Sequence, residues 1–236
     1  MSDRLRIGLL QCGYVHPDLA GDFGDYPVAF GELLEPHDVE LVTYDVQTGP
    51  LPDDPGAVDG WLVSGSASSA YERLPWIPPL EAFLRGLVAR DAPVVAICFG
   101  HQLVAQAHGG RVERSPAGWG AGAHDYELVG TGPWGSTPDR RSVRLIASHQ
   151  DQVVDLPDGD VVIARTDHCP IAGYTLGTSV LAIQAHPEFT AGLSARLTQA
   201  RRDRIGDATA DAALASLDAP LDRAVVGSWM ADHWRR

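Results

Sequence analysis

The chain has 236 residues and a formal net charge of −13, from 18 basic and 31 acidic residues, and it contains neither Lys nor Asn. The missing Lys excludes Schiff-base chemistry, a Ser–Lys dyad and a P-loop, while the acidic balance argues against binding nucleic acids or anionic membranes. Three scattered Cys residues do not make a disulfide framework, and no apolar run is long enough for a membrane span, so we expect a cytoplasmic protein with free thiols.

Short apolar strands alternate with helical patterns over the first part of the chain. Strands are predicted at 4–11, 39–44, 60–63 and 93–97, helices at 28–34, 77–89 and 101–108, and a Gly- and Asp-rich loop at 13–25. Strands separated in this way by helices are typical of a sheet with parallel strands.

The second part of the chain is less regular. Residues 111–145 are rich in Gly, Pro and charge, which indicates hairpins and loops at the sheet edge. Trp119 and Trp134 in these loops are more often part of a core, and the alternative is that they shape an acceptor or partner surface. Further strands are predicted at 161–164 and 180–184, and helices at 194–205, 208–217 and 218–234.

These elements predict an α/β fold with a doubly wound, mostly parallel sheet in residues 1–191. Residues 192–236 should form a C-terminal helical extension packed on this domain. The apolar stripe of the last helix, which includes Trp229 and Trp234, is interpreted as docking against the main domain. A homodimer contact is the alternative.

The strongest local signal is an abrupt change from strand to helix around Cys98. The residues before it form an apolar strand, and a helical pattern follows. A tight turn of this kind is a nucleophile elbow, which exposes the sulfur at the carboxyl edge of the sheet, and small neighbours such as Gly100 relieve crowding around it. The positive end of the following helix favours the thiolate. We therefore predict that Cys98 is a nucleophile and that Cys12 and Cys169 are buried, inert thiols.

His186 and Glu188 follow the strand predicted at 180–184. Residues two apart in an extended segment point to the same side. Glu188 can therefore bind one imidazole nitrogen of His186, and the other nitrogen is left to accept the proton of Cys98. Taken alone, His186 is better explained as a surface histidine beside a solvated Glu. Together with Cys98, a Cys-His-Glu triad is favoured.

Four blocks of the sequence, in order, resemble the class I (triad) glutamine amidotransferases. Residues 63–66 are similar to the oxyanion-loop block, 97–102 to the nucleophile block, 148–153 to the substrate-flanking block and 185–189 to the His/Glu block. The resemblance extends over residues 4–190. Details such as Ser-Gly-Ser in the first block most resemble the free-standing subgroup related to the glutaminase domain of GMP synthase.

The resemblance implies a mechanism and a set of binding residues. Cys98 would attack the side-chain amide carbon of glutamine, and a γ-glutamyl thioester would form and then be hydrolysed. Backbone N–H groups of Ser66 and Phe99 would hold the oxyanion. The resemblance assigns the remainder of the substrate pocket to Gly65, Gln102, His149, Gln150, Asp151 and Gln152. Many family members have Gly-Gly-Pro where this chain has Gly65, Ser66 and Ala67, a departure that could narrow or reshape the pocket.

We therefore expect hydrolysis of glutamine to glutamate and ammonia, without a metal or a cofactor. Few residues follow the last block, so the ammonia would be used by a separate ammonia-accepting enzyme. Two alternatives remain open. One is a γ-glutamyl peptide or γ-glutamyl amine hydrolase that uses the same triad. The other is a regulatory or binding subunit with latent activity.

Overall fold

The computed structural model describes residues 4–130, 132, 137, 139–157 and 159–236, so Trp134 lies outside the described residues. Within these residues, one nine-stranded sheet has the order β2-β1-β3-β4-β11-β10-β9-β6-β7. Its parallel part consists of β2 (Val39–Asp45), β1 (Leu5–Gln11), β3 (Gly60–Val63), β4 (Val94–Ile97) and β11 (Val180–Ile183). Antiparallel pairing continues it through β10 (Gly173–Leu176), β9 (Val161–Arg165), β6 (Gly120–Leu128) and β7 (Ser142–His149).

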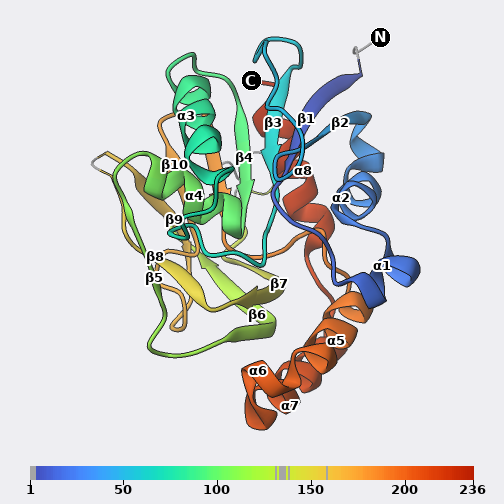
Figure 1. The fold of residues 1–236 in the computed structure, drawn as a ribbon. Coiled ribbons are helices and arrows are strands. Elements are labelled where there is room, and N and C mark those ends of the chain that lie inside the picture. Colours follow the sequence, from blue (N-terminus) through green and yellow to red (C-terminus); the bar gives the residue numbers. More distant parts are fainter. Residues whose placement is uncertain (1–3, 131, 133–136, 138, 158) are drawn as a thin grey trace.

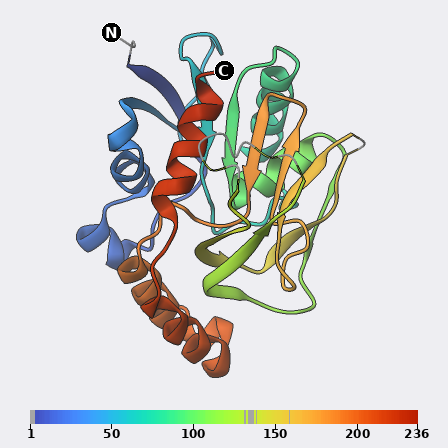
Figure 2. The same cartoon turned by 180° about the vertical axis from the view of Figure 1, so that it is seen from behind.

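Helices cover both faces of the parallel strands (Figures 1 and 2). Helices α2 (Tyr26–Leu34) and α8 (Arg223–Trp234) pack on one face, and α3 (Ile77–Val88) and α4 (Phe99–Ala107) on the other. Strand β4 shows why both faces are covered: Val95 and Ile97 point into the first core, whereas Val94 and Ala96 point into the second. A strand that is apolar on both faces has to be buried between two layers of helices. The predicted α/β class is thus confirmed.

The C-terminal helices α5 (Ala191–Ala200), α6 (Arg202–Ile205) and α7 (Asp207–Ala215) lie beyond the end of the sheet, next to β6 and β7 (Figure 1). The backbone N–H of Ala123 in β6 donates to Ser216 Oγ at 2.7 Å. Helix α8 then returns to the sheet, and Trp229 and Trp234 are buried in the core of this same chain, as the docking interpretation predicts. No helix in the described part of the chain is long and apolar enough to cross a membrane.

The structure adds elements that the sequence patterns did not predict. Helix α1 (Pro17–Phe23) lies inside the predicted loop 13–25, and it begins at His16, whose Nδ1 accepts from the backbone N–H of Asp18 at 3.3 Å. Pro at the first helical position favours a helix start there. The hairpins predicted at the sheet edge for residues 111–145 are confirmed in the described residues by the antiparallel pair β6–β7, and β5 (Arg111–Arg114) precedes this pair. Strand β10 was missed, and so was β8 (Asp151–Asp155), which pairs with β5 in a separate two-stranded sheet.

Gly100→Ala should destabilise the fold by about 2 kcal/mol, a typical cost of overpacking a closely packed core. A Cβ at Gly100 would lie 2.7 Å from the carbonyl oxygen of Val63 and 2.8 Å from its Cβ, so β3 and α4 would have to separate. Gly86→Ala is the matched control, because its Cβ would meet nothing within 4 Å. We expect this control to be neutral or stabilising by up to about 1 kcal/mol. Urea unfolding of both variants measures the difference, and equal free energies of unfolding would contradict the close contact.

Candidate active site

Cys98 occupies a strained turn between β4 and α4. Its backbone dihedral angles are φ 52° and ψ −101°, a region that residues other than Gly rarely adopt. Such strain costs on the order of 1–3 kcal/mol and persists only where the surroundings enforce it. Here the Cys98 N–H donates to the carbonyl of Ile183 at 2.9 Å, which fixes the turn to the end of β11. The turn holds the thiol at the carboxyl end of the parallel strands.

His186 and Glu188 lie in the loop that follows β11. The His186 N–H donates to the Ile146 carbonyl at 2.9 Å, and the imidazole stacks on Phe189 with the ring centroids 4.1 Å apart. His186 Nδ1 lies 2.7 Å from Glu188 Oε1, and both side chains are buried. The carboxylate therefore accepts the Nδ1 proton and leaves Nε2 for Cys98.

The electrostatics of this group favour a charged imidazole. Burial is the largest influence on the pKa of His186 and would lower it from 6.5. The negative charges of Glu188 and of the Cys98 thiolate act in the opposite direction, and together they raise the pKa of His186 above 6.5. The imidazole is thus suited to hold a proton beside the sulfur, and a neighbouring imidazolium is one of the features that activate a cysteine nucleophile.

The loop after β3 passes directly over the imidazole. Ser64 is fully buried, and its Oγ accepts from the Cys12 N–H at 2.9 Å, which holds the loop against β1. A Cβ at Gly65 would lie 2.7 Å from Tyr26 Oη and 3.0 Å from His186 Cε1. A residue without a side chain is therefore required at this point. Ser66, the next residue, lines the same cavity as Cys98.

A cavity of about 240 Å³ has Cys98 at one wall. Ser66 and Gln102 line it, together with residues of the β7–β8 turn and two arginines of the C-terminal helices, Arg201 and Arg204. Gln184 Nε2 donates to Cys98 Sγ at 3.5 Å, and Gln102 Nε2 donates to Gln184 Oε1 at 3.1 Å. The nucleophile is thus held by a buried chain of amides that leads to the cavity.

Comparison with known proteins shows the family to which the chain belongs. Residues 32–199 match the model of the family "Glutamine amidotransferase class-I". The chain belongs to the class-I glutamine amidotransferase family. It is 30% identical over 196 residues to gamma-glutamyl peptidase 3 of Arabidopsis thaliana, covering 79% of this chain and 77% of that one. It is 34% identical over 142 residues to a GMP synthase [glutamine-hydrolyzing] of Albidiferax ferrireducens, covering 57% and 26% respectively.

The amidotransferase fold is also shared with solved structures. A glutamine amidotransferase from Thermotoga maritima superposes with a TM-score of 0.77 at 16% identity, covering 98% of this chain and 96% of that one. At this level of identity the likeness concerns the fold. The matched length includes the C-terminal helices, so these helices are part of the shared architecture.

Of the binding residues suggested by the amidotransferase resemblance, some line the cavity and one does not. Gln102, His149, Gln150 and Asp151 line the cavity. The side chain of Gln152 is directed elsewhere, because its Nε2 donates to the His168 carbonyl at 2.8 Å and it does not line the cavity.

The structure also indicates the charge of His149 and the part of Phe99 that can face the site. His149 is neutral near pH 7, since burial lowers its pKa to about 3. The Phe99 side chain packs against Trp76 in the core, with ring centroids 5.4 Å apart, so only its backbone is available to an oxyanion.

Several residues of this amidotransferase site were missed by sequence reasoning. Gln184 is a polar residue at the end of an otherwise apolar strand, fully buried, and that break in the pattern was a usable signal. Arg201 and Arg204 carry no such signal, because they stand in a helix rich in charge. The other two thiols are in apolar surroundings: burial raises the pKa of Cys12 far above 9.0 and that of Cys169 to about 12.

Proposed function

We propose that this protein is a cysteine amidohydrolase that cleaves γ-glutamyl amide bonds, with glutamine as the leading substrate. The observation that supports it is the Cys98 elbow beside the buried His186–Glu188 pair, at the wall of an open cavity. A nucleophile, its base and the group that orients the base are all that a thioester mechanism requires. Family membership adds the class of reaction.

The chemistry follows from the positions of the protons. The Cys98 thiolate attacks the γ-amide carbon, and backbone N–H groups of Phe99 and Ser66 stabilise the oxyanion. The C–N bond breaks as the His186 imidazolium gives its proton to the departing nitrogen, so ammonia leaves and a γ-glutamyl thioester remains. His186, now neutral, accepts a proton from water, whose oxygen attacks the thioester. The C–S bond then breaks and releases the Cys98 thiolate beside the His186 imidazolium, which is the starting state. Glutamate departs, and its new γ-carboxyl group loses its proton to solvent.

A second candidate is the hydrolysis of γ-glutamyl peptides by the same triad. The relative from Arabidopsis thaliana that is named a gamma-glutamyl peptidase favours this reading. The two candidates differ in the amine that departs and share every step at Cys98.

Turnover of glutamine and of γ-glutamyl dipeptides by the purified protein tests both candidates. Glutamate release is measured for each substrate at equal concentration. Release from either substrate supports the proposed amidohydrolase, and release from peptides alone excludes glutamine as the leading substrate. No release from any of them would overturn the proposed function. Rapid glutamine turnover by the protein alone would count against a separate ammonia-accepting enzyme.

A further inference from the structure

Two arginines of the C-terminal helices reach the active-site cavity without an acidic partner. Arg201 and Arg204 both line it. Other arginines of the same helices do pair: Arg196 lies 3.4 Å from Asp22, and Arg202 lies 2.9 Å from an oxygen of Asp207. In the described part of the chain, neither Arg201 nor Arg204 forms a salt bridge, although the protein carries an excess of 13 negative charges. Two adjacent cations left uncompensated in so acidic a protein indicate a place for an anion.

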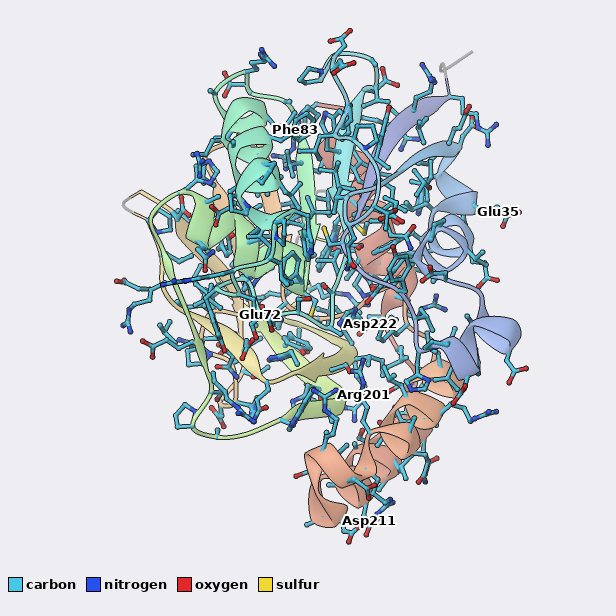
Figure 3. All side chains as sticks on the ribbon, in the orientation of Figure 1. Glu35, Glu72, Phe83, Arg201, Asp211 and Asp222 are labelled. Atoms are coloured by element: carbon cyan, nitrogen blue, oxygen red, sulfur yellow. The ribbon has the colours of Figure 1, made fainter. Side chains whose placement is uncertain are left out.

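Both side chains are held toward the cavity. Arg201 is half-buried, and its Nη1 donates to Ser148 Oγ of β7 at 3.0 Å, where the C-terminal helices approach the sheet (Figure 3). The guanidinium of Arg204 lies 5.6 Å from the ring centroid of Trp119, a cation–π contact, and Trp119 lines the same cavity. Each arginine still has N–H donors that no protein acceptor occupies among the described residues.

The position of Arg201 indicates at which end of the cavity Arg201 and Arg204 lie. Arg201 lines the cavity together with Cys98. Burial lowers the pKa of the Arg201 guanidinium, and the nearby Tyr26 hydroxyl acts in the opposite direction. Tyr26 Oη and His186 Cε1 flank Gly65 from one side, at 2.7 and 3.0 Å from where its Cβ would be. His186 gives its proton to the departing nitrogen, so the leaving amine lies on this side. Gln102, which the amidotransferase resemblance implies contacts the amino-acid part of the substrate, donates to the Asp151 carbonyl at 2.8 Å, and this marks the other end of the cavity.

The acidic side chains of the cavity lie at the end that holds Gln102, away from the leaving amine. Asp151 Oδ1 accepts from the Tyr71 hydroxyl at 3.1 Å, and Glu72 Oε1 accepts from the Ser69 N–H at 3.1 Å. Asp151 is thus bound to the loop after β3, and Glu72 is bound within that loop. Arg114 of β5 also lines the cavity and lies opposite Asp151 in the β5–β8 pair, so it belongs to the same end. The leaving-group end is left with a positive potential next to the nucleophile.

We propose that Arg201 and Arg204 bind a carboxylate carried by the leaving amine, so that, among γ-glutamyl amides with a leaving amine larger than ammonia, the protein prefers γ-glutamyl amino acids and peptides with a free carboxylate on the amine side. The planar guanidinium matches a carboxylate in shape and charge, and it donates two parallel hydrogen bonds. This inference rests on the proposed amidohydrolase function. It makes the C-terminal helices part of substrate selection, because they supply both arginines.

Two substrates that differ only in this charge test the inference: γ-glutamyl-glycine and the neutral γ-glutamyl-glycinamide. We expect kcat/KM to be about tenfold higher for γ-glutamyl-glycine than for γ-glutamyl-glycinamide, mostly because KM is lower. A tenfold difference corresponds to the lower end of the free energy of a hydrogen bond to a charged group. Arg204→Gln should remove most of this preference, and the double variant with Arg201→Gln should remove all of it. Arg204 is exposed, so its replacement leaves folding intact even if that of Arg201 does not.

Arg202→Gln is the matched control, with the same charge change on the same helix and side-chain bonds that point to Asp207 and Asp211. It should keep the preference. Equal kcat/KM for the two substrates in the unsubstituted protein would overturn the inference. Equal losses of kcat/KM for both substrates in Arg204→Gln would also overturn it, because they would mean that Arg204 binds the carboxylate of the γ-glutamyl part.

Calorimetric binding of both compounds to Cys98→Ala protein gives the same comparison without turnover. A tenfold tighter binding of γ-glutamyl-glycine supports the subsite, and equal binding overturns it. If the unsubstituted protein releases glutamate neither from these two compounds nor from glutamine, the proposed function fails, while the binding comparison still decides the carboxylate subsite.

Discussion

Cys98→Ala should lower the release of glutamate from γ-glutamyl substrates by at least about 10⁴-fold, because loss of a covalent nucleophile removes the whole thioester route. The fold should change little. Ala meets the same turn at φ 52° as Cys does, and the side chain is small. Steady-state assays of glutamate release measure the loss, and circular dichroism with thermal unfolding checks the fold.

Covalent trapping provides the complementary result. A glutamine-mimicking diazo or chloroketone reagent should add one mass equivalent at Cys98 in the unsubstituted protein and none in Cys98→Ala. Cys169→Ala is the control, since the raised pKa of this buried thiol leaves it unreactive. An adduct at Cys169, or full activity of Cys98→Ala, would refute the assignment of the nucleophile. Absence of an adduct at Cys98 would instead favour a binding or regulatory subunit.

Glu188→Gln should reduce kcat by about 10³–10⁴-fold, comparable with the loss when the orienting acid of a related triad becomes an amide. The amide can present an N–H to His186 Nδ1, which favours the wrong tautomer. The variant also loses the negative charge that helps to raise the pKa of His186. The side chain keeps its size, so the packing around it is preserved.

The pH profile separates these electrostatic effects from general damage. The departing nitrogen needs a protonated His186, so activity falls on the basic side as pH rises through the pKa of His186. With Glu188 neutralised, that pKa is lower, and the basic limb of kcat should move to lower pH. A profile that keeps its basic limb in place while kcat falls would show that Glu188 acts through packing alone. A Gly86→Ala protein, altered far from the triad, should keep the parent profile.

The local elements of this protein follow from its sequence to a large extent. The apolar runs of β1, β3 and β4 and the stripe of α3 were predicted close to their observed bounds. In each case the pattern is set by residues within one element. Strand β10 was missed because its partners, β9 and β11, determine it more than its own composition does.

Which residues meet at the site depends on how the strands pair. The elbow at Cys98 and the spacing of His186 and Glu188 are visible in the sequence, because each is a local feature at the end of a strand. Their proximity comes from the pairing of β4 with β11, in which Ile97 lies opposite Ile183. The two strands are distant in the sequence, but their carboxyl ends lie next to each other. The residues that follow them therefore lie at the same edge of the sheet.

The sequence by itself determined the α/β class, the nucleophile elbow and the His/Glu motif, since periodicity and tight-turn chemistry act over a few neighbouring residues. Only the tertiary structure decided which other side chains meet at Cys98. Gln184 reaches the sulfur because of strand register, and Arg201 and Arg204 reach the cavity because α5–α7 lie across the ends of β6 and β7. Contacts of this kind depend on the packing of distant segments, which leaves no periodic mark on the sequence of either one.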